Sequence, residues 1–234
     1  MNKSKSKVLF KPQPLHGFER SRVLYIPMDA PSKIIGKALK KRAVKATTTP
    51  LGQVFLLKET AVIHLVVGAP TAVIWLERFV ASGAKELLIL GFCGSLKSET
   101  NIADPILITK ALSEEGTSRH YFPRRRIFRP STSLQSEVRQ TLRTRKLPCI
   151  EGSVVSTDAP FRETESWLEK NRKKGIGFVD MEASAVFALA EFHGIKPAAL
   201  MLVTDKLTAN KHKIHFKHPD LTKNIQKYFF PFME

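Results

Sequence analysis

The sequence predicts a single α/β domain with a mixed, mainly parallel central sheet and helices on both of its faces. Short β-branched apolar runs alternate along the chain with amphipathic stretches of helical length, a pattern typical of alternating strands and helices. Several runs are apolar throughout, as expected for strands that are covered on both faces. Gly83 and Gly194 directly follow two helical stretches, at the position where a helix commonly ends in a left-handed residue.

The order of these elements predicts two βαβ units. The predicted strands are residues 23–28, 53–57, 62–68, 87–91, 105–109, 150–156, 176–181 and 198–204. The predicted helices are residues 32–42, 71–82, 133–145, 163–173, 183–193 and 220–228. Helices 71–82 and 183–193 each lie between two predicted strands, so each should connect parallel strands by a right-handed crossover.

Length and composition are those of an ordinary globular chain. The 234 residues are 43% hydrophobic and 25% charged, which fits one large domain. We expect residues 1–20 to form a basic N-terminal arm and residues 21–234 to form one domain. No charge-free apolar stretch approaches the ~20 residues that a bilayer-spanning helix needs, and no apolar signal-peptide core follows the basic start. Cys93 and Cys149 lie in apolar runs, which predicts free thiols and therefore a cytoplasmic protein. Because no stretch is suited to span a bilayer, no membrane partner is expected.

The net charge is the unusual feature. Lys and Arg number 38 against 21 Asp and Glu, a formal net charge of +17. Solvated basic faces and loops are the favoured interpretation of the basic clusters, and nucleic-acid binding is the alternative that we do not favour. Residues 124–129 interleave arginines with aromatic and apolar residues between two prolines and should form a loop. No metal-ligand spacing or RNA-binding aromatic signature occurs, so no metal site is expected.

Polar and acidic residues follow many of the predicted strands. In open α/β sheets ligands bind beyond the carboxyl ends of the strands, so these residues are candidates for a binding site. They include Asp29, Thr71, Gly91, Gly94, Ser95, Asp158, Asp180, Glu182 and Asp205. Individually they have structural explanations as well: Asp29 and Asp158 fit helix or turn caps, and a carboxylate at Glu182 would be stabilised by the start of a helix.

Three segments resemble the nucleoside phosphorylase superfamily, which contains purine nucleoside and uridine phosphorylases and methylthioadenosine nucleosidases. Residues 68–96 (GAPTAVIWLERFVASGAKELLILGFCGSL) resemble its strand, helix and glycine turn at the phosphate corner, and residues 154–163 (VVSTDAPFRE) resemble its base-pocket loop. Residues 177–207 contain Asp-Met-Glu-Ala-Ser-Ala and a later Thr-Asp, similar to the family's ribose motif and catalytic aspartate. The resemblance implies cleavage of the N-glycosidic bond of a purine nucleoside.

The resemblance also implies roles for individual residues. Glu182 matches the carboxylate that accepts hydrogen bonds from the ribose 2′- and 3′-hydroxyls, and Met181 would pack against the sugar. Phe161 matches the aromatic residue that stacks on the base, and Asp158 lies in the same base-binding loop. Asp205 matches the acid that protonates the purine at N7, which is why a purine is expected as the leaving base.

The corner that would hold the nucleophile departs from the family pattern. Its candidates here are Lys33, Thr71, Gly91, Gly94 and Ser95. Phosphorylases of the family usually hold phosphate with an early Gly-Asp-Pro…Arg motif and with an arginine just before the glycine turn. This sequence has MDAPSK and Ile89 at those places, and Phe92 replaces a small hydroxyl residue. Lysine lacks the guanidinium fork, so Lys33 is not an equivalent donor.

Three functional alternatives remain open at this level. Phosphorolysis is favoured, with inorganic phosphate as co-substrate and no other cofactor. Hydrolysis is the close alternative, with Asp29 activating water, and a catalytically silent binding protein is the third. Because family members are oligomers that share residues across interfaces, a homo-oligomer is expected (a dimer or a trimer of dimers), to whose site His16 of the arm is a candidate contributor. After residue 207, a solvated tail is expected in preference to a mobile lid at Lys211, His212, Lys213, His215 and His218.

Overall fold

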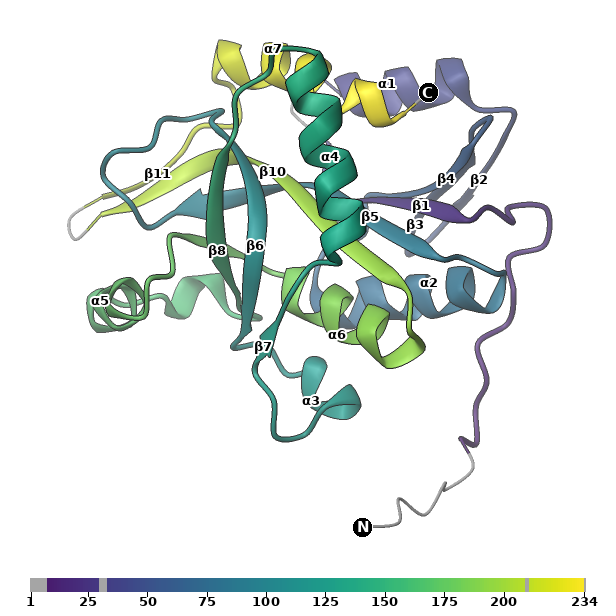
Figure 1. The fold of residues 1–234 in the computed structure, drawn as a ribbon, viewed down its shortest axis with the longest axis horizontal. Helices are drawn as coiled ribbons and strands as arrows, with labels where there is room; N and C mark the ends of the chain where they lie inside the picture. Colours follow the sequence, from purple (N-terminus) through teal and green to yellow (C-terminus); the bar gives the residue numbers. More distant parts are fainter. Residues whose placement is uncertain (1–7, 30–32, 209–210, 234) are drawn as a thin grey trace.

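The computed structural model describes residues 8–29, 33–208 and 211–233. A central sheet is covered by helices on both faces (Figure 1), which confirms the predicted fold class. One face carries α1 (Ile34–Arg42), α4 (Thr132–Thr144) and α7 (Pro219–Tyr228). The other carries α2 (Ala69–Ala81), α5 (Glu165–Lys173) and α6 (Ala183–His193), with the short α3 (Ser118–Tyr121) beside α6.

The sheet is mixed and closes partly on itself. Its order is β11-β10-β6-β8-β9-β5-β1-β4-β3-β2, with β7 on β6 and an additional β10–β5 pairing. Strands β5, β10, β6, β8 and β9 therefore form a closed ring, from which β1, β4, β3 and β2 extend. The strands are β1 (Arg22–Ile26), β2 (Lys45–Thr49), β3 (Gly52–Leu56), β4 (Thr60–His64), β5 (Glu86–Ser95), β6 (Pro105–Ser113), β7 (Ile127–Phe128), β8 (Ile150–Ser156), β9 (Phe178–Asp180), β10 (Lys196–Thr208) and β11 (Lys211–Ile214).

Only the first of the two predicted βαβ units connects parallel strands. Strands β4 and β5 are both parallel to β1, which lies between them, so the first crossover passes over one strand. The second prediction is wrong, because β9 is antiparallel to β5 while β10 is parallel to it. Strand β9 has only three residues and meets the end of β5 at Gly94 and Ser95. There it closes the ring instead of extending a parallel sheet.

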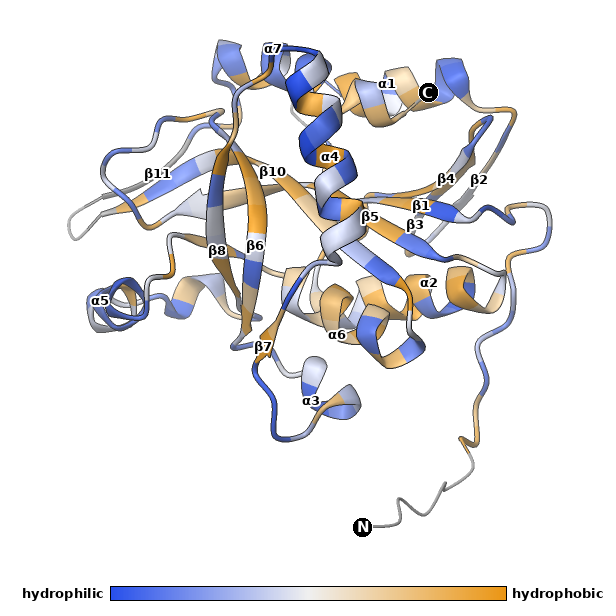
Figure 2. Ribbon diagram, viewed as in Figure 1, coloured by the Kyte–Doolittle hydropathy of each residue, from blue (hydrophilic) through white to orange (hydrophobic). Residues whose placement is uncertain are grey.

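Two apolar layers hold the helices on the sheet. Helix α6 is buried continuously from Ala183 to Ala190, and its apolar character contrasts with the hydrophilic α5 in Figure 2. On the opposite face, Leu221, Ile225 and Phe229 are fully buried against the sheet and α4. The predicted helix at 220–228 is therefore confirmed as α7, which presents an apolar stripe to the core. The expectation of a solvated tail is wrong for Lys211–Ile214, because these residues pair with β10 as β11.

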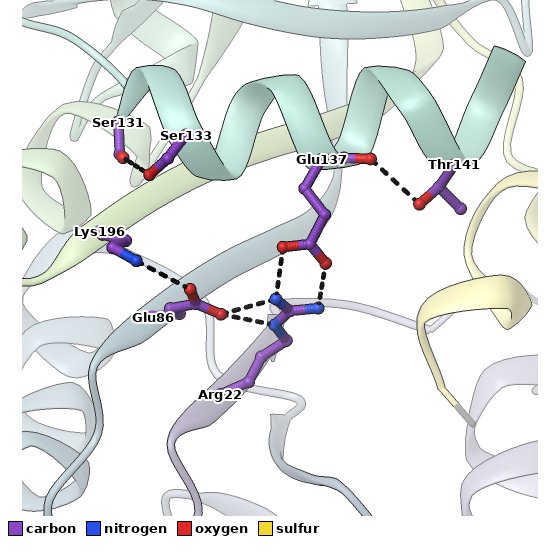
Figure 3. Close-up of polar contacts among 7 residues, drawn as sticks. All are labelled: Arg22, Glu86, Ser131, Ser133, Glu137, Thr141 and Lys196. Atoms are coloured by element: carbon purple, nitrogen blue, oxygen red, sulfur yellow. Dashed lines mark hydrogen bonds and ion pairs between the residues drawn. The ribbon is translucent and has the colours of Figure 1, made fainter.

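Helix α4 is also fixed by an ion-pair network at the amino ends of the central strands (Figure 3). Arg22, the first residue of β1, donates to Glu86 Oε2 of β5 at 2.6 and 2.9 Å and to both carboxylate oxygens of Glu137 on α4 at 2.7 and 2.8 Å. Lys196 of β10 lies 3.5 Å from Glu86. This network leaves the carboxyl ends of the same strands free for a site.

The N-terminal segment packs on the domain where it is described. Leu15 and Phe18 are buried in the core layer beneath α2, and the Leu15 N–H donates to Ser82 Oγ at 2.7 Å. His16 is exposed, and residues 1–7 of the expected arm lie outside the described residues. No described helix is both long enough and apolar enough to cross a bilayer.

Candidate active site

A cavity of about 330 Å³ opens at the carboxyl ends of the central strands, where the sequence places its acidic residues. It collects side chains from the ends of β1, β5, β9 and β10, from the short helix η1 (Pro160–Arg162) and from the segment after β11. The residues that line it are Pro27, Met28, Val67, Phe92, Cys93, Gly94, Pro160, Phe161, Glu163, Val179, Asp180, Met181, Glu182, Thr204, Asp205 and Phe216.

Glu182 is the buried carboxyl group at the start of α6. Its side chain is turned away from the helix that it precedes: Glu182 Oε1 accepts a hydrogen bond of 2.6 Å from the Gly68 N–H. Gly68 has φ +91° and precedes α2, a backbone conformation that side chains other than glycine adopt with strain. The turn before α2 therefore aims one backbone donor at one oxygen of Glu182, whose side chain lines the cavity.

Burial and a second acid change the ionisation of Glu182. Burial, followed by the nearby charge of Asp180, raises the pKa of Glu182 to about 8. Burial also raises the pKa of Asp180 to about 6, although hydrogen bonds from Ser156 and from backbone N–H groups oppose that rise. Once ionised, the carboxylate of Glu182 can accept hydrogen bonds from hydroxyl groups. Because its pKa lies near physiological pH, both its neutral and its charged form are populated there.

Asp205 lies on β10, directly opposite Gly94 of β5. A Cβ atom on Gly94 would stand 2.7 Å from Asp205 Oδ2 and 2.9 Å from Leu207 and Val179, so only glycine leaves room for this carboxyl group. Thr204 Oγ1 donates to Asp205 Oδ1 at 2.8 Å. The structural role of Gly94 is thus to admit Asp205 to the cavity.

Apolar and aromatic groups form most of the remaining wall. Phe161 lines the cavity although its side chain is 99% exposed, so it stands at the mouth, where a planar base would cover it. Phe92 packs against Phe229, with ring centroids 5.8 Å apart, and Phe216 closes the same side. Met181 adds a flexible apolar surface beside Glu182.

The structure brings together only some of the predicted site residues. Met181, Glu182, Phe161, Asp205 and Gly94 line one cavity. The other candidates are placed outside its described lining: Asp29, Lys33, Thr71, Gly91, Ser95 and Asp158.

Three of these outlying candidates have structural partners. Asp29 caps α1, accepting from the Ile35 and Gly36 N–H groups at 3.1 and 2.9 Å. Asp158 Oδ2 accepts from the Gly116 N–H at 2.8 Å. Ser95 is fully buried and shares a hydrogen bond of 2.6 Å with Thr100 Oγ1.

The predicted nucleophile corner has little cationic character. Lys33 is exposed at the start of α1, with a left-handed backbone, and the three residues before it lie outside the described chain. Gly91 and Ile89 are buried in β5. Among the described residues that line the cavity, four are acidic and none is lysine, arginine or histidine.

Several lining residues were not among the sequence candidates. Glu163 is the last residue of the base-pocket loop, Val179 precedes Asp180, and Thr204 precedes Asp205. Their adjacency to candidate residues is the signal that identifies them. Phe216 had no such signal, because it reaches the cavity only through the β10–β11 hairpin. Among the described residues, no group of three or more His, Cys, Asp or Glu side chains is arranged to hold a metal ion.

Residues 124–129, the arginine-rich segment, follow α3 and include β7, and part of the segment packs against the domain. The Arg125 guanidinium carbon stands 4.1 Å from the ring centroid of Phe122 and 4.8 Å from that of Phe128. The same side chain pairs with Glu191 of α6 at 2.5 Å. Arg124 and Arg126 are exposed on either side of it, as expected for a solvated basic loop.

Comparison with known proteins gives a consistent family. Residues 36–228 match the family model described as the phosphorylase superfamily. The guanosine phosphorylase of Halorubrum lacusprofundi is 29% identical over 147 residues, which cover 63% of this chain and 61% of that protein. A DeoD-type purine nucleoside phosphorylase of Vibrio parahaemolyticus is 26% identical over 152 residues, 64% of each chain. The chain thus spans somewhat less than two thirds of these curated relatives.

Solved structures share the fold at low sequence identity. Purine nucleoside phosphorylase from Toxoplasma gondii in complex with immucillin-H superposes with a TM-score of 0.73 and 19% identity, covering 92% of this chain and 90% of that one. AMP nucleosidase from Bacteroides thetaiotaomicron gives a TM-score of 0.70 and 20% identity, covering 79% and 78%. These likenesses establish the architecture on which the cavity is built.

Proposed function

Because the chain belongs to the phosphorylase superfamily, we propose that it cleaves the N-glycosidic bond of a purine nucleoside. The observation that carries the proposal is the presence of Glu182 and Asp205 in one cavity. The first carboxyl group lies at the start of α6 and the second at the end of β10. Two acids separated by 23 positions in the sequence thereby face one ligand-sized space.

The reaction needs a held sugar and a stabilised leaving base. Glu182, fixed on one side by the Gly68 N–H, would accept hydrogen bonds from the ribose hydroxyls with its second oxygen. Asp205 would donate a proton to the purine as negative charge builds on the base. Phe161 would cover the base at the mouth, an interaction worth ~1–3 kcal/mol for base–aromatic stacking.

We propose inorganic phosphate as the acceptor of the ribosyl group, since the relatives with the greatest similarity reported above carry the name phosphorylase. A second candidate is water, and the cavity lining favours it: four carboxyl groups and no cation line the described cavity, and a phosphate dianion gains from charge-assisted donors. The fold likeness to an AMP nucleosidase is compatible with both acceptors.

Two further features of the working protein are proposals as well. A homo-oligomer would supply side chains to the open mouth, where the lining residues Val67 and Phe161 expose about half or more of their surface. A cytoplasmic location is supported by the free thiols of Cys93 and Cys149, since disulfides form mainly in oxidising compartments.

A nucleoside panel with and without phosphate tests the proposal. We expect release of free base from purine nucleosides. Ribose 1-phosphate as the sugar product identifies phosphate as the acceptor, and free ribose identifies water. Asp205→Asn should lower turnover by about 10²–10⁴-fold, the usual contribution of a general acid. Asp220→Asn, the same change on a carboxylate that is 61% exposed on α7, should leave it unchanged. Undiminished turnover in Asp205→Asn would reject the assignment.

A further inference from the structure

We propose that Asp180 is the positioning residue for Glu182, because it accepts from the backbone N–H of Glu182 and holds Ser156, whose hydroxyl caps α6. The inference rests on the proposed function only for the use of Glu182 in ribose binding. It concerns a side chain that the sequence places at a strand end but that the resemblance leaves without a role.

The helix cap is the first observation. Glu182 occupies the N-cap position of α6 but makes no capping hydrogen bond with its side chain. Asp180 Oδ2 instead accepts from the N–H groups of Glu182 and Ala183, at 3.2 and 2.7 Å. An N-cap side chain ordinarily accepts from the N–H of the second or third helical residue, but the N–H of Ser184, the second residue of α6, donates to Ser156 Oγ at 2.9 Å. Because Asp180 and Ser156 bind the N–H groups at the start of α6, the carboxyl group of Glu182 faces Gly68 and the cavity instead.

The second observation is that Asp180 is itself held firmly. Its other oxygen, Oδ1, accepts from Ser156 Oγ at 2.5 Å, and Ser156 Oγ accepts in turn from the Ser184 N–H at 2.9 Å. Ser184 Oγ donates to the buried Glu115 at 2.9 Å. Asp180 thus joins the end of β8 to the first turn of α6 through a continuous set of buried hydrogen bonds.

Glu115 anchors the far end of this set. It is 1% exposed and accepts from the Thr117 and Ser118 N–H groups, at 2.5 and 3.0 Å, and from the hydroxyls of Ser113, Ser118 and Ser184. A buried carboxylate with so many donors has a single favoured placement. The position of Glu182 is therefore set by a network that reaches from the loop after β6 to α6.

Asp180 also acts on Glu182 through its charge. The titratable groups that face Glu182 are Asp180 of β9, Asp158 after β8 and the buried Tyr25 of β1. After burial, Asp180 is the largest cause of the raised pKa of Glu182, and Asp158 contributes less. Removing the charge of Asp180 while keeping a capping side chain should therefore lower the pH at which Glu182 ionises.

Two substitutions separate the cap from the charge. The amide oxygen of Asn can still accept from the Glu182 and Ala183 N–H groups, so Asp180→Asn keeps an acceptor for the start of α6, whereas Asp180→Ala removes it. For Asp180→Ala we expect kcat/KM to fall on the order of 100-fold, as for a misplaced substrate-holding group, with a raised KM. Asp180→Asn should retain most of kcat/KM at its own optimum, while the midpoint of its rise with pH moves to lower pH.

A cap elsewhere in the fold supplies the control. Thr164 caps α5 by accepting from the Trp167 N–H at 3.2 Å, so Thr164→Ala should lower stability without altering KM or the pH profile. Unchanged KM and kcat/KM in Asp180→Ala, or an unmoved pH midpoint in Asp180→Asn, would overturn the inference.

Carboxyl ¹³C NMR makes the test independent of turnover. The Glu182 resonance, assigned by its loss in Glu182→Gln, should titrate at lower pH in Asp180→Asn than in the wild-type chain. If the wild-type chain cleaved no nucleoside, the proposed function would be rejected. The titration of the Glu182 resonance would still decide the role of Asp180, because it does not depend on turnover. Identical Glu182 titration curves in the two proteins would overturn that role.

Discussion

The raised pKa of Glu182 predicts that the protein loses stability as the pH rises, and that Glu182→Gln removes this loss. Glutamine is nearly isosteric with a protonated glutamic acid, and its amide oxygen can accept the Gly68 N–H. In the folded state the pKa of Glu182 is about 8, against 4.5 for an ordinary glutamate. Between these values the unfolded state binds fewer protons than the folded state, so the free energy of unfolding falls as pH rises.

The size of the stability difference follows from the difference between the two pKa values of Glu182. A difference of 3.5 units at about 1.4 kcal/mol per unit gives an upper limit of about 5 kcal/mol. Local relaxation reduces the effective cost of burying a charge, so we expect roughly 2–4 kcal/mol. Wild type and Glu182→Gln should therefore unfold at similar urea concentrations near pH 5, and the variant should be the more stable of the two by this amount above pH 8.

Urea unfolding at unit steps from pH 5 to pH 9 measures the difference directly. The comparison is internal, because all other titrating groups are common to the two proteins. A stability difference that stays constant over this range would refute the reasoning, since it would mean that Glu182 ionises at the same pH in the folded and unfolded chains.

Three further predictions follow from other residues. Phe161→Ala should raise the KM for a purine nucleoside by about 5- to 150-fold, the equivalent of ~1–3 kcal/mol of stacking; an unchanged KM would remove Phe161 from the base site. Burial lowers the pKa of His64 to about 4, with Asp29 3.7 Å away, so wild-type stability should fall by up to about 3 kcal/mol as the pH drops from 6.5 to 4. His64→Leu should lack this acid-linked loss in urea titrations, and an equal loss in both proteins would count against it. Ile225→Ala truncates a core side chain of α7 and should lower the free energy of unfolding by ~2–5 kcal/mol. A change under 0.5 kcal/mol in urea unfolding would show that α7 does not pack in the core.

The helices and most strands could be predicted because their signals are local. The predicted helix at 183–193 coincides with α6, and that at 220–228 differs from α7 by one residue. The rule that ligands bind beyond strand carboxyl ends also placed Glu182 and Asp205 near the cavity that both of them line.

The remainder depends on contacts between distant segments. The direction of β9 is set by its pairing with the end of β5, and a three-residue run carries no signal for that pairing. Phe216 reaches the cavity because β11 folds back on β10, within a stretch whose many lysines and histidines suggest solvent. Asp29 and Asp180 are both acidic residues at strand ends, yet only Asp180 lines the cavity. The carboxylate of Asp29 instead accepts hydrogen bonds from the N–H groups of Ile35 and Gly36.

An experimental structure of the protein with a purine nucleoside bound would test the shared site most directly. Ribose hydroxyls should lie within hydrogen-bonding distance of Glu182, about 2.6–3.2 Å between heavy atoms, and the imidazole edge of the base should lie within the same distance of Asp205. A nucleoside bound elsewhere, or one that contacts only one of these two carboxyl groups, would contradict this placement of the substrate.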